Sequence, residues 1–94
     1  MNTLEKERIV KKNILQIFKE NFDVSQTTDD EILNIKPDQE LSINYAVYYE
    51  SILDIFFIED MEPESIKGTV KDTIKKVTEL WPMIPNSSWE WQMQ

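Results

Sequence analysis

The sequence contains no cysteine and no histidine. Without cysteine the chain cannot form a disulfide, a thiolate nucleophile or a zinc–thiolate site. Without histidine it lacks the side chain most often used as a general base, a proton shuttle or a metal ligand. One glycine cannot build a phosphate-cradling loop, and the glycine-containing motifs of nucleotide-binding proteins and serine hydrolases are missing. We therefore expect a protein that is not an enzyme and that works by being bound.

Long apolar runs are missing as well. No stretch approaches the ~20 consecutive apolar residues of a membrane span, and the first residues lack the uninterrupted apolar run of a signal peptide. We therefore expect a cytoplasmic protein. The 94 residues, of which 40% are hydrophobic, suit one small folded domain rather than a disordered chain.

The negative charge is concentrated in the middle of the chain. The net charge is −8, and residues 21–65 hold twelve acidic side chains against the single base Lys36. Charge of one sign over a small domain speeds encounters with basic partners and argues against nucleic acid or an anionic membrane as ligand. A solvated acidic face that only keeps the protein soluble is the alternative.

Three segments show the three/four spacing of apolar residues that predicts an amphipathic helix. The first covers residues 4–21. The second begins at Ser42; its run ILDIFFI could also form a buried strand, but tyrosines at helical spacing favour a helix. The third follows Thr69, which with Asp72 forms the pattern of a capping box, and it ends at Pro82.

Between the first two helices lies a long polar segment, residues 23–41. Its apolar residues are too sparse for a long amphipathic helix and suit a loop pinned to the core, with one turn around residues 29–33. Loops longer than ~12–15 residues are uncommon in small domains unless they have a function.

These patterns predict an all-α fold, a small helical bundle of three main helices plus a short one. We place the bundle in residues 1–81 and a C-terminal tail in residues 82–94. The tail contains Trp89 and Trp91. We expect a strap docked on the core, with a partner-binding or loosely ordered end as the alternative.

Acidic side chains are plentiful, but their spacing does not predict a metal site. The pattern of a calcium-binding loop is missing, and Gly68, the only glycine, is far from the acids at 29–31. We predict no metal, with weak divalent binding at the acidic face as the alternative.

The order of these elements resembles that of an acyl carrier protein. The family's modified serine lies in an Asp-Ser-Leu motif that opens its second helix, and this chain has Leu41-Ser42-Ile43 at the start of the predicted helix. The segment from Ile66 through Thr69-Val70 is similar to the Ile…Thr-Val segment that opens the family's last helix. The resemblance spans residues 7–77 and leaves the tail outside it.

The resemblance implies a mechanism and a set of partners. A phosphopantetheinyl transferase would attach 4′-phosphopantetheine to Ser42, and the thiol of that arm would carry an acyl thioester in fatty acid or polyketide biosynthesis. Ser51, which follows Glu50 and precedes Ile52, is the second candidate for attachment. Acyl-transferring or acyl-loading enzymes would read the acids that project from the second helix beside the serine. These acids are Glu50, Asp54 and Glu59.

A different class of protein remains open. An acidic interaction protein without covalent modification, such as an immunity protein, an inhibitor or a DNA mimic, would also have small size, concentrated negative charge and exposed aromatic residues. The two tryptophans of the tail slightly favour this class.

Overall fold

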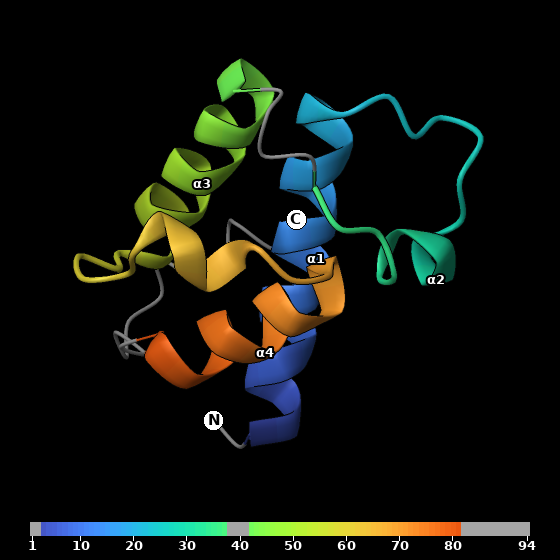
Figure 1. Ribbon diagram of the computed structural model, residues 1–94. Coiled ribbons are helices and arrows are strands. Elements are labelled where there is room, and N and C mark those ends of the chain that lie inside the picture. The colour runs from blue at the N-terminus through green and yellow to red at the C-terminus, as the bar shows by residue number, and fades with distance from the viewer. Residues whose placement is uncertain (1–2, 38–41, 82–94) are drawn as a thin grey trace.

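The structure is a computed structural model that describes residues 3–37 and 42–81. This part of the chain forms α1 (Thr3–Asn21), α2 (Asp29–Ile32), α3 (Ser42–Phe56), the 3-10 helix η1 (Pro63–Ile66) and α4 (Val70–Leu80) (Figure 1). No strand occurs within the described residues. The predicted all-α bundle of three main helices and a short one is confirmed, and the strand alternative for ILDIFFI is excluded.

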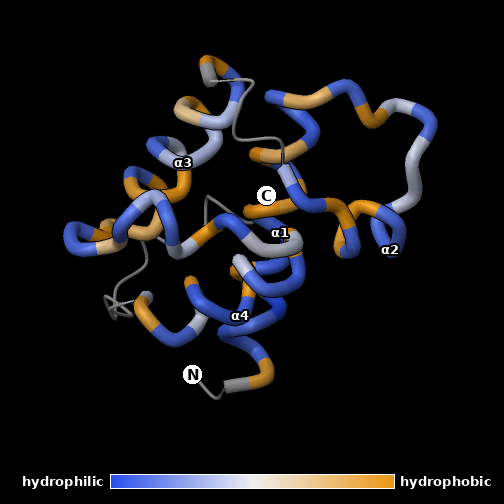
Figure 2. The backbone as a smooth tube through the Cα atoms, viewed as in Figure 1, coloured by the Kyte–Doolittle hydropathy of each residue, from blue (hydrophilic) through white to orange (hydrophobic). Residues whose placement is uncertain are grey.

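Helix α1 is the centre of the bundle because it packs against both α3 and α4. Figure 2 shows apolar positions recurring along α1 and α3 between polar ones, as expected for helices with one buried stripe. The polar Asn13 is also buried, and its side-chain amide donates to the Ile9 carbonyl at 2.9 Å. The buried apolar residues of α1 are Ile9, Val10, Ile14, Leu15, Ile17 and Phe18.

The long segment after α1 swings away from the bundle and returns through α2 (Figure 1). A capping box starts α2: the Glu31 backbone N–H donates to the Thr28 hydroxyl oxygen at 3.2 Å, and the Thr28 N–H donates to the Glu31 carboxylate at 3.0 Å. Lys19 of α1 forms an ion pair with Asp29 at 2.7 Å, and Ile32 is fully buried. The predicted turn in a loop pinned to the core is confirmed at this point.

The returning segment also completes the start of α4. The N–H groups of Val70 and Lys71 donate to the carbonyls of Ile35 and Leu33, each at 2.9 Å. The predicted capping box of Thr69 and Asp72 is present and satisfies the next donors. The N-terminus of α4 thus has no open donors for an anion, because loop carbonyls and the capping box accept from all of them.

Two tyrosines of α3 hold the segment that leads into η1. The Tyr45 hydroxyl donates to the Pro63 carbonyl at 3.1 Å, and the Tyr49 hydroxyl donates to the Met61 carbonyl. Partial burial raises the pKa of Tyr45, and nearby Glu64 raises it further. Each bond joins α3 to backbone that follows it in sequence, so η1 is fixed against the same helix.

Tyr48, on the same helix, points into the core. Its ring meets Phe18 edge to face, with centroids 5.5 Å apart. The Tyr48 and Thr73 hydroxyls are both fully buried and neither has a hydrogen bond of normal geometry. Burial raises the pKa of Tyr48, and the neighbouring Thr73 hydroxyl opposes the rise. These two groups are therefore a weak polar contact between α3 and α4.

Helix α3 ends at Phe56, so Glu59 follows the helix instead of projecting from it as the sequence analysis expected. The tail of residues 82–94, with Trp89 and Trp91, lies outside the described residues. Among the described residues, every helix is too short or too polar to cross a membrane.

Candidate functional site

Ser42 is the first residue of α3. The position agrees with the sequence analysis, which places this serine at the opening of the second long helix. Leu41 and the three residues before it lie outside the described part of the chain, as does the Ser42 side chain. The adjoining Ile43 is exposed, and it is one of the few large apolar side chains that face solvent.

Ser51, the second candidate for attachment, lies in the middle of α3 and is half-buried. Its neighbour Ile52 is completely buried in the core. A bulky group attached to Ser51 would project from the middle of the helix, at a residue that the bundle partly covers. The position therefore suits an attached arm less well than the first residue of the helix.

The three acidic candidates gather at the far end of α3 from Ser42. Glu50, Asp54 and Glu59 are all exposed and line one depression of about 390 Å³, together with Leu53, Phe57 and Ile58. A helix rises about 1.5 Å per residue, so roughly 18 Å of helix axis separates Asp54 from Ser42. The structure thus brings the three acids together, but around Phe57 and not beside the serine.

A second depression, of about 400 Å³, adjoins the first. It shares Phe57, Ile58 and Glu59 with the first depression and adds Asp60 and Leu80. We call the residues lining the two depressions the Phe57 surface. None of the described residues that line it is basic.

Phe57 itself has an unusual backbone conformation. Its φ is +53°, and among the described residues it is the only non-glycine residue with positive φ. The Ile58 N–H donates to the Leu53 carbonyl at 3.1 Å, which closes the end of α3 in the hydrogen-bond pattern of a Schellman motif. Glycine usually occupies this position, because the left-handed conformation costs other residues about 1–2 kcal/mol. A large ring stands here instead, and its residue is 56% exposed.

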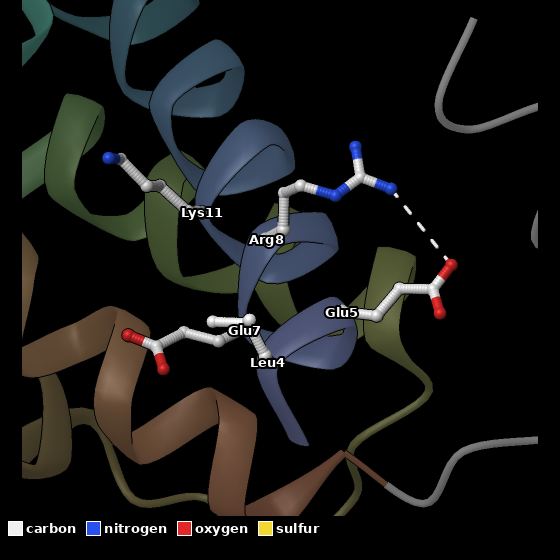
Figure 3. Close-up of a pocket in the computed structure, with 5 residues that line it drawn as sticks. All are labelled: Leu4, Glu5, Glu7, Arg8 and Lys11. Carbon is white, nitrogen blue, oxygen red and sulfur yellow. Dashed lines mark ion pairs between the residues drawn. The ribbon is translucent and has the colours of Figure 1, made fainter. Parts of the chain in front are cut away.

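Another depression lies elsewhere and does not form a site. It measures about 620 Å³ and is lined by Leu4, Glu5, Glu7, Arg8 and Lys11, all from the first turns of α1. Figure 3 shows Glu7 and Lys11 pointing to one side of the helix while Arg8 and Glu5 form an ion pair on the other, at 4.0 Å. The charged groups do not converge on a common point, so they cannot together hold a ligand.

Among the described residues, no group of three or more acidic side chains is arranged to hold a metal ion. The acids of α2 are used locally: hydrogen bonds from the Thr28 backbone and hydroxyl lower the pKa of Glu31. Outside α2, acidic residues line the depression at the start of α1, where basic residues accompany them, and the Phe57 surface, where none of the described lining residues is basic.

Comparison with protein-family models, with curated proteins and with solved structures found no match to this chain. We therefore infer the function of this chain from its residues and their arrangement.

Sequence reasoning found the acids of this region but missed Phe57. The periodic pattern assigned ILDIFFI to one apolar run, and nothing in it marks Phe57 as the residue that turns outward. The absence of glycine and proline between Ser42 and Met61 concealed the end of the helix.

Proposed function

We propose that this chain is a carrier protein of the acyl-carrier type, with 4′-phosphopantetheine attached to Ser42. The observation that carries the proposal is the position of Ser42 as the first residue of α3, within the helix order that the resemblance implies. A long first helix, a loop with one turn, a second long helix, a short helical link and a last helix follow one another in that order.

The physics of a helix start supports this attachment point. The N-terminal end of a helix carries partial positive charge, which stabilises a phosphate. A phosphate ester on Ser42 would lie at that end of α3, a helix of 15 residues. The corresponding end of α4 is already filled by loop carbonyls and its capping box, as described above.

The chemistry of loading needs little from the carrier. A phosphopantetheinyl transferase would join the serine oxygen to the phosphorus of the pantetheine phosphate, forming a phosphodiester while the pyrophosphate bond of coenzyme A breaks. Adenosine 3′,5′-bisphosphate would leave, and the transferase would take up the serine proton. The thiol of the arm would then accept an acyl group as a thioester from a partner enzyme. The lack of histidine and cysteine is compatible with this role, because the cofactor supplies the reactive group.

The experiment is an intact-mass spectrum after incubation with coenzyme A and a broad-specificity transferase. We expect wild type and Ser51→Ala to gain one phosphopantetheine and Ser42→Ala to gain none. Circular dichroism of Ser42→Ala serves as the folding control, since loss of a serine that only caps α3 costs about 1 kcal/mol. No gain with several transferases would overturn the proposal.

An acidic interaction protein without modification is the second candidate. The exposed apolar ring of Phe57 among acidic neighbours favours it, because aromatic anchors with a charged rim are typical of protein interfaces. Failure of Ser42 to accept the arm, together with tight and salt-sensitive capture of a basic protein, would support this candidate over the carrier.

A further inference from the structure

The Phe57 surface stands at the opposite end of α3 from Ser42. Figure 1 shows that the segment following α3 and the last turn of α4 lie on the same side of the molecule. Ser42 and Phe57 are roughly 22 Å apart along the helix axis. The two places are therefore separate surfaces of the molecule.

The Phe57 surface has an apolar centre and an acidic rim. Phe57 is 56% exposed and Leu80 is 39% exposed, so both offer apolar area to a partner. Glu50, Asp54 and Glu59 are exposed around the first depression. Asp60 adds a fourth acid beside the second.

The rim is also free of cations in the described part of the chain. None of the described lining residues is a lysine or an arginine, and the two ion pairs found in that part of the chain join other residues. The potential over this surface is therefore negative, and it favours a partner with positive charge around an apolar anchor.

The backbone of Phe57 adds to this argument. A glycine at this position would remove the cost of the left-handed conformation without changing the end of α3. This conformation holds the Phe57 ring at the surface, where 56% of the residue is exposed, as a binding anchor requires.

We propose that the Phe57 surface binds a basic amphipathic helix of a partner protein, with an apolar residue of that helix against Phe57. Charge complementarity selects a basic partner, and the paired depressions on either side of Phe57 accept side chains from successive turns. An apolar centre with an acidic rim matches the apolar stripe and basic flanks of such a helix, which binds through anchors at spacings of three and four.

The inference does not rest on modification of Ser42. If the carrier function holds, the surface is where a partner enzyme would dock away from the arm. If it fails, the surface still defines the partner of an unmodified interaction protein. The test therefore uses the full chain without phosphopantetheine, so that failure of one proposal is separate from failure of the other.

The probe is a short synthetic helix of leucine and lysine, with leucines at spacings of three and four. A matched peptide with glutamate in place of lysine controls for non-specific apolar binding. Titration calorimetry gives Kd, and amide chemical-shift changes locate the site. We expect the lysine peptide to shift residues 50–60 and the end of α4, and the glutamate peptide to leave them unchanged.

Variants separate the anchor from the rim. We expect Phe57→Gly to raise Kd about tenfold or more. The double variant Glu50→Gln/Asp54→Asn, which leaves the fold intact, is expected to raise it about two- to fivefold for each charge removed. Two changes at exposed positions away from the surface, Ile43→Ala in the first turn of α3 and Glu20→Gln in the last turn of α1, are the matched controls and should leave Kd unchanged.

Three outcomes would overturn the proposal. One is equal binding of the lysine and glutamate peptides. Another is a shift map centred on α2 or on the first turns of α1. The third is a Kd that responds to Glu20→Gln as strongly as to the rim variants, which would mean that the net charge alone attracts the peptide.

Discussion

Replacing Phe57 with glycine and, separately, with alanine tests the conformation at the end of α3. Both changes remove the same ring, so the loss of its contacts cancels when the two variants are compared. The left-handed backbone, with φ of +53°, costs alanine about 1–2 kcal/mol and costs glycine nothing. Glycine also gives the unfolded chain extra entropy, which reduces its advantage by about 0.4–1 kcal/mol. We therefore expect Phe57→Gly to be more stable than Phe57→Ala by about 1 kcal/mol.

The assay is thermal and urea unfolding followed by circular dichroism. A difference of about 1 kcal/mol corresponds to a shift in Tm of about 4–8 °C for a domain of this size. Gln16 is the matched control because it is exposed in the interior of α1. At that position the order should reverse, with alanine more stable than glycine by about 1 kcal/mol. If alanine is also the more stable residue at position 57, then Phe57 does not adopt the left-handed conformation and the argument from its cost fails.

Three further predictions concern the core and the caps. Burial keeps the Tyr48 phenol neutral in the folded state and raises its pKa, so stability should fall as pH rises above about 10, where the unfolded phenol ionises first. In Tyr48→Phe the free energy of unfolding, measured by urea titration between pH 9 and 11, should decline less steeply, by up to about 1.4 kcal/mol per pH unit. An unchanged slope would contradict burial of the phenol. Thr69→Ala should destabilise the protein by about 1 kcal/mol in the same assay, because it removes the cap of α4, and a neutral result would mean that the loop carbonyls alone hold that end. Because the pKa of Glu31 is lowered, its hydrogen bonds from Thr28 should persist above the ordinary value of 4.5 and weaken as pH falls below it, and faster amide exchange in α2 at low pH would reveal this. Thr28→Ala, which keeps the backbone N–H and loses the hydroxyl, should reduce this pH dependence, and Glu31→Gln should remove it.

The main helices could be predicted from sequence because their signals are local. In α1 and α4 the apolar residues repeat at three and four, and the Thr69–Asp72 pattern marks the start of α4. The turn at α2 was also within reach, since a threonine followed three residues later by a glutamate is a capping box. These features depend on residues within one or two turns of each other.

The contacts of the loop could not be predicted in the same way. Leu33 and Ile35 accept hydrogen bonds from the start of α4 through backbone carbonyls, which carry no side-chain signature. The tyrosines of α3 looked equivalent by spacing, yet the Tyr48 hydroxyl is buried in the core, while the Tyr45 hydroxyl donates to the first residue of η1 and the Tyr49 hydroxyl donates to Met61 before it. The difference depends on what packs beside each ring, and that is set by tertiary structure.

In the candidate site, too, a local feature could be predicted from the sequence and a tertiary one could not. The position of Ser42 at a helix start follows from a local pattern and agrees with the structure. The position at which α3 ends determines how the three acids Glu50, Asp54 and Glu59 group around Phe57. No glycine or proline near Phe57 marks that end in the sequence. The sequence analysis expected these acids beside Ser42, whereas in the structure they line the depression around Phe57.

The most direct test of the carrier function is a fragment-ion mass spectrum of the transferase-treated chain after proteolysis. The account predicts that the phosphopantetheine is found on the peptide that contains Ser42, at the serine oxygen, and that the peptide containing Ser51 remains unmodified. An arm on Ser51 would keep the carrier function but contradict the placement of its site. A Ser42 peptide that stays unmodified, in a chain that gains no mass, would contradict the carrier function itself.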